Sequence, residues 1–239
     1  MRCVIESLLL CKEKENLTCE IIKVDEIMSI EKKRLIVLPI ETAVVVLLTF
    51  LPKIIAACGG TTFPGFNIVV YLLIAISACL AIKLSEVKID FEWKNYKQFL
   101  IGAGVALFLS LCIAWIPALC GSSIVGGHTN FDIAEFFINL FFFMLIVGPV
   151  EELVFRIYYQ KVLVTFFKNM RIVAVLLASL IFGLWHWING SLFQVLFTFG
   201  IGLVFGVVKE YVKDMHYPGI ALSHGLYDFL NYIVRLTVA

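Results

Sequence analysis

The chain has few charged residues for its length. Only 15% of its 239 residues are Asp, Glu, Lys or Arg, and 61% are apolar, whereas soluble domains have about 25% charged residues. A soluble protein of this composition would lack the polar surface needed to face water, and a lipid bilayer removes that requirement. The formal net charge of +1 gives no sign of a nucleic-acid partner. The scarcity of charge therefore predicts an integral, multi-pass membrane protein.

The sequence also lacks the signatures of several other classes. Its seven cysteines form no CxxC pair and no zinc-finger spacing with histidine, and the HExxH zinc motif is absent. No internal repeat of the kind found in many transporters is visible. The start, MRCVIESLLLCKEKEN, has a short apolar run broken by Glu6 and no cleavage site of small residues. We therefore expect no cleavable signal peptide.

Long apolar runs dominate the rest of the chain. A helix needs about 20 mostly apolar residues to cross a bilayer. Such runs cover residues 35–57, 65–82, 99–119, 133–155, 172–188, 192–209 and 217–237, and the fourth is expected to continue as helix to about Phe167. The predicted fold is an all-α, polytopic transmembrane helical bundle of about seven spans. Its expected parts are a cytoplasmic N-terminal segment (1–34), transmembrane helices without a recognised motif (35–132) and a catalytic helical core (133–239).

Basic residues alternate between the segments that join these runs. The N-terminal segment and the loops after the second, fourth and sixth runs are rich in Lys and Arg, whereas the intervening loops are nearly bare. Because basic loops tend to stay in the cytoplasm, the alternation predicts a cytoplasmic N-terminus. Glu41, Lys53 and Arg235 lie near the ends of runs, where long side chains can reach the membrane interface. We expect these three to be interfacial.

The first of three polar clusters at membrane depth is Glu151-Glu152-Leu-Val-Phe-Arg156. A charged group there costs at least about 2.5–3.5 kcal/mol to insert. Glu152 and Arg156 are spaced i,i+4 and can pair on one helix face, whereas Glu151 points about 100° away and has no obvious local partner. A paired carboxylate beside an unpaired one suits a site in which one is structural and the other acts as a base. An interfacial salt bridge is the alternative.

The other two clusters lie on the fifth and seventh runs. Phe182 and His186 share a helix face at i,i+4, and His224, Asp228 and Asn231 form a polar stripe on one face of the last run. An apolar helix with such a stripe must turn it away from lipid. A structural histidine and hydrogen bonds between helices are the alternative explanations.

Helix geometry links the first two clusters. Glu151 and His186 lie on either side of the polar turn 168–171, and a rise of about 1.5 Å per residue places them roughly 25 and 22 Å from it. In an antiparallel helix pair the two side chains would then have nearly the same depth. This coincidence favours a shared site.

These clusters carry a resemblance to a known family. GPVEELVFR, FGLWH and HGLYD resemble, in order and spacing, the EExxxR, FxxxH and HxxxN/D motifs of the CPBP intramembrane proteases. That family includes type II CAAX prenyl endopeptidases and bacteriocin-processing or self-immunity proteins. The resemblance covers roughly residues 133–235. It implies a helical bundle with a polar cavity open toward the cytoplasm, and cleavage of a membrane-associated protein or peptide, lipidated or not.

The resemblance also implies a role for each motif residue. Glu151 would activate water as general base, His186 would help hold that water, and His224 with Asp228 would stabilise the oxyanion. Supporting residues would be Glu152, Arg156, Phe182 and Asn231. Two histidines and Glu151 could instead bind zinc, and the motifs leave open whether a metal or glutamate-activated water is used. Because an ionised Asp only accepts hydrogen bonds, Asp228 would be protonated, would orient His224, or would ligate a metal, and Asn231 could supply an amide donor or bridge helices.

Two other classes compete with the peptidase interpretation. A proton-coupled transporter also uses buried Glu and His, and a non-catalytic immunity or binding protein could keep the fold without turnover. The expected partners are a protein or peptide substrate and membrane lipid, with no nucleic acid. The intact Glu151, His186 and His224 favour the peptidase.

Overall fold

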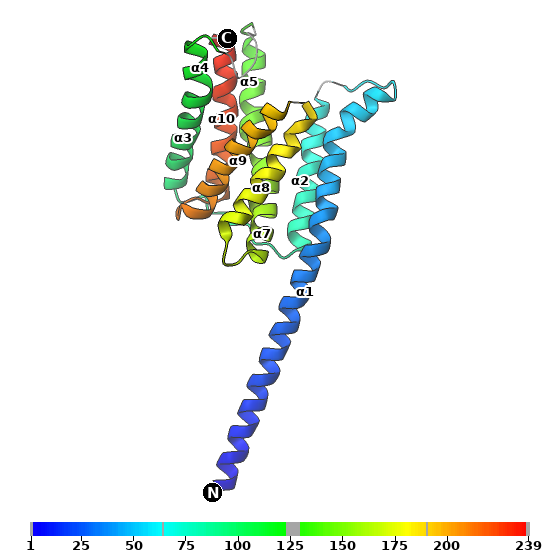
Figure 1. Ribbon diagram of the computed structural model, residues 1–239, viewed down its shortest axis with the longest axis vertical. Coiled ribbons are helices and arrows are strands. Elements are labelled where there is room, and N and C mark those ends of the chain that lie inside the picture. The colour runs from blue at the N-terminus through cyan, green and yellow to red at the C-terminus, as the bar shows by residue number, and fades with distance from the viewer. Residues whose placement is uncertain (1, 64, 123–129, 190, 238–239) are drawn as a thin grey trace.

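The computed structural model describes residues 2–63, 65–122, 130–189 and 191–237, and these residues contain helices and no strands. Helices pack side by side into a bundle, and the N-terminal half of the first helix projects from one end (Figure 1). The elements in chain order are α1 (Arg2–Ala57), α2 (Phe66–Leu84), α3 (Lys97–Ser110), η1 (Leu111–Trp115), α4 (Ile116–Leu119), α5 (Ile133–Phe142), η2 (Phe143–Val147), α6 (Gly148–Glu152), η3 (Leu153–Gln160), α7 (Lys161–Phe166), α8 (Arg171–Trp185), η4 (His186–Asn189), α9 (Leu192–Tyr211) and α10 (Tyr217–Thr237). The all-α prediction is confirmed.

Most of the predicted spans have the length and apolarity needed to cross a membrane. Among the described residues these stretches are Ser29–Ala57, Phe66–Leu84, Lys97–Leu119, Ile133–Phe166 and Leu192–Tyr211. The fifth and seventh predicted runs are also helices, α8 and α10, but α8 has only 15 residues and α10 carries the polar stripe. The helix α8 is apolar but short, and Leu176, Leu180 and Leu184 on it are exposed.

One long helix forms the start of the chain, and it holds the buried Glu41. The boundary expected at residue 34 lies inside α1, which continues as one helix to Ala57. Glu41 is 4% exposed and accepts a hydrogen bond from Ser77 Oγ at 3.0 Å, so its predicted interfacial position is wrong. The hydroxyl on α2 compensates part of the cost of burying this carboxyl group.

The predicted fourth span is one helical rod, Ile133–Phe166. Within it, some turns are π-helical and therefore wider than α-helical turns. The segment η2 ends two residues before Pro149, and η1 ends two residues before Pro117. A proline lacks the N–H of an ordinary helical residue, and its ring collides with the carbonyl four residues earlier. A local π turn is one way for a helix to accommodate this. The third π segment, η3, begins directly after Glu152, so π turns flank the paired glutamates on both sides.

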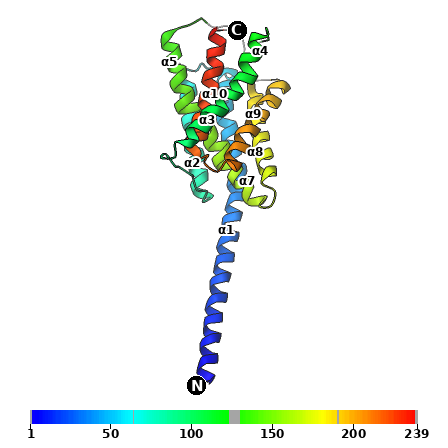
Figure 2. The same ribbon diagram turned by 90° about the vertical axis from the view of Figure 1, so that its left-hand side faces the viewer.

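Glycines set how closely the rod approaches α10, which lies between α3 and α5 in Figure 1 and near the middle of the bundle in Figure 2. A Cβ at Gly148 would lie 2.5 Å from the carbonyl oxygen of Ala221, and one at Gly225 would lie 2.5 Å from the carbonyl oxygen of Phe143. These positions therefore have room only for glycine. The close crossing brings the paired glutamates of α6 against His224.

The helix α9 also approaches its neighbours through glycine. A Cβ at Gly202 would lie 2.7 Å from the Phe182 ring, and one at Gly206 would lie 2.9 Å from Val175. The two glycines, spaced i,i+4, therefore let α9 pack closely against α8. This packing fixes Phe182 between α9 and the rod.

Candidate active site

A cavity of about 740 Å³ lies between α2, the α5–α6 rod, α9 and α10. Its floor includes Glu151, which is 4% exposed. Its rim includes the exposed Glu135 and Phe193, which begin α5 and α9, and Arg235 near the end of α10. These helix ends lie at the end of the bundle away from the α1 projection (Figure 1). We call this the cavity end, and Arg235, which was expected to be interfacial, belongs to its rim.

The position of the rim brings two of the expectations from the sequence into conflict. The sequence predicts a cytoplasmic N-terminus, and the resemblance implies a cavity open toward the cytoplasm. The projecting helix and the rim lie at opposite ends of the bundle. The two expectations therefore cannot both hold.

His224 is the centre of the polar groups beneath the cavity. Its Nδ1 lies 2.7 Å from Glu152 Oε1, and its Nε2 lies 3.6 Å from both Glu151 Oε2 and Asp228 Oδ2. The ring is 3% exposed and stacks on Phe205 at a centroid distance of 4.9 Å. If Nδ1 donates its proton to Glu152, the other ring nitrogen is aimed between two carboxylates.

Glu151 has a partner that the sequence did not reveal. Tyr71 on α2 donates its phenolic hydrogen to Glu151 Oε1 at 2.8 Å. This bond holds one carboxylate oxygen and leaves Oε2 directed at His224. Tyr71 sits in an apolar run within the part of the chain that carries no motif, and its one sequence signal is a phenol that needs a partner at membrane depth.

The expected pair of Glu152 and Arg156 is present and fully buried. Arg156 Nε lies 3.4 Å from Glu152 Oε2, and both side chains are 0% exposed. The guanidinium nitrogens make no hydrogen bond among the described residues, and the guanidinium carbon lies 4.9 Å from the centre of the Phe182 ring. Charge attraction and a cation–π contact therefore hold Arg156. Glu152 joins it to His224 and supports the ring from below.

His186 lies at the end of α8, where the helix gives way to the 3-10 turn η4. Its Nδ1 is 2.9 Å from the carbonyl oxygen of Phe182, and the two rings pack at 4.6 Å. As a hydrogen bond from Nδ1 to that carbonyl, this contact leaves Nε2 as an acceptor. His186 and Glu151 line the same cavity, as the equal-depth argument predicted.

Asp228 and Asn231 line the cavity wall on α10. Asp228 is oriented toward His224, although 3.6 Å exceeds hydrogen-bond length. Asn231 Oδ1 accepts a hydrogen bond from Ser110 Oγ at 3.1 Å and so bridges α10 to α3. That contact fixes the amide group without using its N–H donors. The helix-bridging role of Asn231 is thus observed, and its role as an oxyanion donor stays a prediction.

The positions of the three candidate zinc ligands bear on whether they could share one ion. Glu151, His186 and His224 are not arranged to share an ion: among the described residues no three His, Cys, Asp or Glu side chains form a group that could hold a metal. His224 contacts carboxylates through both ring nitrogens. Zinc binding by Glu151, His186 and His224 therefore stays a prediction, and no step below uses a metal.

Comparison with known proteins finds a family model that matches part of the chain. Residues 133–230 match the family model described as type II CAAX prenyl endopeptidase Rce1-like. No curated protein and no solved structure matches the chain. The matched region contains all three motifs and runs from α5 into α10. The apolar helices and this match make the chain an integral membrane protein, and they support intramembrane endopeptidase activity. Residues 133–230 are thus similar to the Rce1-like family of type II CAAX prenyl endopeptidases.

Proposed function

We propose that the protein cleaves a peptide bond of a membrane-associated protein or peptide with water activated by Glu151. The observation that carries the proposal is the convergence of Glu151, His224 and Asp228 beneath one cavity, with distances of 3.6 Å from His224 Nε2 to each carboxylate. A base must lie within reach of a water, and its environment must hold it in one orientation. Tyr71 supplies that orientation at Glu151 Oε1.

In the proposed reaction Glu151 carries the proton, and His224 and His186 supply the hydrogen bonds. Glu151 Oε2 takes a proton from water as the water oxygen bonds to the scissile carbonyl carbon. Protonated His224 Nε2 donates a hydrogen bond to the resulting oxyanion, and His186 Nε2 accepts one from the attacking water. The carbon–nitrogen bond then breaks, and Glu151 returns its proton to the leaving amine. Glu152 keeps Nδ1 of His224 engaged at 2.7 Å, so the ring cannot turn away.

This scheme favours one of the three possible roles of Asp228. A carboxylate near Nε2 attracts the protonated ring and orients it, while His224 donates to the oxyanion. Asn231, whose amide is fixed by Ser110, would supply a second donor. Loss of one such donor typically costs about 10²–10³ in rate.

The test is cleavage by the purified protein in lipid nanodiscs. Farnesylated and unmodified peptides with CAAX termini would be incubated with wild type, Glu151→Gln and Glu92→Gln, with and without a chelator. Because removal of a general base costs about 10²–10⁴ in rate, Glu151→Gln should lose turnover by that factor and keep its unfolding midpoint. Glu92 is exposed at the other end of the bundle, and its variant should cleave normally.

Three results would contradict the proposal. Full turnover by Glu151→Gln would remove the base. Absence of cleavage by wild type for every peptide would favour the transporter or non-catalytic alternatives. A loss of wild-type activity with chelator would replace glutamate-activated water by metal-dependent hydrolysis.

A further inference from the structure

A groove of about 360 Å³ lies between α1 and the turn that joins α7 to α8. This turn is at the end of the bundle from which the N-terminal half of α1 projects (Figure 1), whereas the active-site cavity is at the other end. No residue that lines the groove also lines that cavity. The groove is therefore separate from the candidate active site, and the proposed reaction gives it no role.

The lining of the groove is rich in positive charge. Three of its residues are the cations Arg34, Lys168 and Arg171, and one is an acid, Glu31. A guanidinium presents its N–H donors in a rigid fork that fits the oxygens of a phosphate, and an ammonium adds a point charge. The groove therefore has the charge and the donors that suit a phosphate group.

Contacts with the backbone hold Arg34 at the groove. Its Nε donates to the carbonyl oxygen of Ser85 at 2.9 Å, and its Nη2 donates to the carbonyl oxygen of Glu86 at 3.5 Å. These carbonyls directly follow α2, so the arginine joins α1 to the end of the neighbouring helix. The two contacts leave other N–H donors of the guanidinium for a ligand. Arg34 thus provides a cation that is already oriented.

The other two cations have carboxylate partners that a ligand could replace. Lys168 Nζ lies 3.1 Å from Glu31 Oε1, and Arg171 Nη1 lies 3.3 Å from Glu210 Oε1. The side chains of Lys168 and Arg171 are 67% and 60% exposed. Exposed ion pairs of this kind are weak, so both cations can turn toward a phosphate that carries its own negative charge.

Apolar surface continues from the groove along α1 and α8. The two helices run side by side, because Lys168 contacts Glu31 at one end and Trp185 Nε1 donates to Thr49 Oγ1 at 2.7 Å at the other. Large apolar side chains are exposed on both helices: Leu35, Ile36 and Ile40 on α1, and Ile172, Leu176 and Leu180 on α8. In a membrane such faces contact lipid chains. A ligand with a phosphate and apolar tails therefore matches both the groove and its surroundings.

We propose that this groove binds the headgroup phosphate of an anionic phospholipid, whose acyl chains lie along the exposed apolar faces of α1 and α8. Basic pockets between transmembrane helices recognise anionic headgroups. A zwitterionic lipid also has a phosphate, but its choline cation would meet the same basic side chains, so the groove should prefer an anionic lipid. The bound lipid would join α1 to α8, the helix that directly precedes His186. The proposal does not depend on peptidase activity.

The test measures the lipid preference of the purified, full-length protein in detergent micelles. Native mass spectrometry would record bound dioleoyl phosphatidylglycerol and dioleoyl phosphatidylcholine, and thermal unfolding would be followed at the same lipid concentrations. Wild type should bind phosphatidylglycerol about tenfold or more tightly than phosphatidylcholine, since hydrogen bonds between charged groups are worth about that factor. Its unfolding midpoint should rise with phosphatidylglycerol, because a ligand stabilises the state that binds it.

The variants separate the groove from general positive charge. Lys168→Gln combined with Arg171→Gln should lose the preference for phosphatidylglycerol and keep the unfolding midpoint measured without added lipid, because both side chains are exposed. Lys94→Gln combined with Lys213→Gln is the matched control, since it removes the same charge from exposed positions outside the groove. The control should keep the preference. Lys168→Arg retains the charge and should bind phosphatidylglycerol as wild type does.

Competition with soluble anions distinguishes a lipid headgroup from free phosphate. Inorganic phosphate and glycerol 3-phosphate should not displace phosphatidylglycerol, because they lack the acyl chains that contact α1 and α8. Displacement by either anion would assign the groove to a soluble phosphate and overturn the lipid as its ligand. Equal binding of the two lipids by wild type would also overturn the proposal, as would a preference that survives in the double variant of Lys168 and Arg171 or is lost in the matched control.

Discussion

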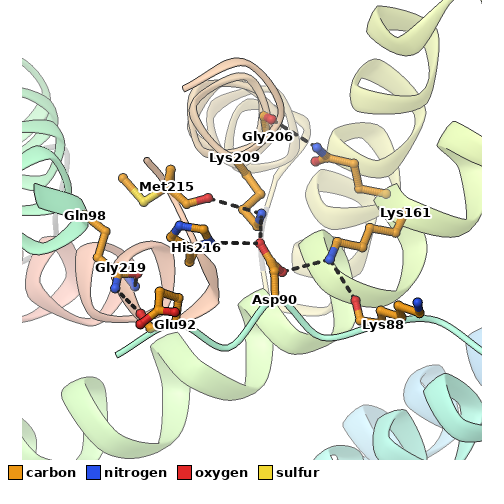
Figure 3. Close-up of polar contacts among 11 residues, drawn as sticks. Lys88, Asp90, Glu92, Gln98, Lys161, Gly206, Lys209, Met215, His216 and Gly219 are labelled. Carbon is orange, nitrogen blue, oxygen red and sulfur yellow. Dashed lines mark hydrogen bonds and ion pairs between the residues drawn. The ribbon is translucent and has the colours of Figure 1, made fainter. Parts of the chain in front are cut away.

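The two ends of the bundle use charged groups in opposite ways. Residues 85–96 join α2 to α3 at the end of the bundle away from the cavity, and we call this the strap end. There Asp90 lies between Lys161 and Lys209 (Figure 3), so one carboxylate meets two cations. Beneath the cavity three carboxylates surround His224. The first arrangement gives a carboxylate two cationic partners and ties helices together. The second leaves acidic groups beside a hollow, which is costly for stability and useful for proton transfer. The contrast separates residues that hold the fold from those expected to act on a substrate.

The largest expected effect concerns Arg156, the cation beside the carboxylate-rich cluster. Arg156→Met would leave Glu152 buried without its ion-pair partner, which typically costs about 3–5 kcal/mol. The unfolding midpoint of the purified protein should fall strongly. Lys33→Met is the matched control, because the Lys33–Glu86 pair is about half exposed and such pairs contribute about 0–1 kcal/mol. Equal, small shifts in both variants would show that the buried pair is not structurally important.

A smaller effect is expected at Tyr71, which orients the proposed base. Tyr71→Phe removes the hydrogen bond to Glu151, and bonds to charged groups contribute about 1.5–3 kcal/mol. If this bond matters mainly during catalysis, kcat should fall by roughly tenfold to a hundredfold with an unchanged KM. Tyr211→Phe alters an exposed phenol at the strap end and should leave kcat unchanged. An unaltered rate for Tyr71→Phe would separate Tyr71 from the site.

The smallest expected effect is at Asp90. Burial raises the pKa of this carboxyl group, but Lys209 and Lys161 outweigh burial, and the pKa lies below its usual value. His216 Nδ1, 3.9 Å from the carboxylate, adds attraction when protonated. A lowered pKa in the folded state means that the stabilisation is fully present above the unfolded pKa of about 3.9. It is lost as the pH falls through the lower folded value.

Asp90→Asn should therefore lower stability by about 1–3 kcal/mol at neutral pH, since the lysines keep their charge and lose their partner. The difference between wild type and variant should shrink as the pH drops below about 4. Thermal unfolding across this pH range measures it. A constant difference at all pH values would mean that Asp90 does not act through its charge.

The sequence alone was sufficient to predict the helices and the motif residues that meet beneath the cavity. Apolar runs mark helices directly, and the spacing of Glu152 with Arg156 or of Phe182 with His186 follows from helical geometry alone. The contact of Glu152 with His224 depends on the crossing of α6 and α10 at Gly148 and Gly225. No local pattern encodes that crossing.

Other features could not be predicted because they arise between distant segments. Tyr71 is 80 positions from Glu151 in the chain, and an apolar run with one tyrosine is an ordinary membrane helix. Glu41 lies where an interfacial acid is expected, yet its carboxyl group accepts a hydrogen bond from Ser77 on the neighbouring helix. The end of the bundle at which the cavity lies depends on the positions of all helix ends at once. Charge alternation predicts only the orientation of the loops.

The most direct measurement compares Glu151→Gln and Asp90→Asn in one experiment, with turnover per folded molecule and unfolding midpoint recorded for each. The proposed division of roles predicts opposite outcomes. Glu151→Gln should keep the wild-type midpoint and lose about 10²–10⁴ in rate, whereas Asp90→Asn should unfold more easily and cleave at the wild-type rate. A Glu151→Gln protein that cleaves normally, or an Asp90→Asn protein that is stable and inactive, would contradict the account.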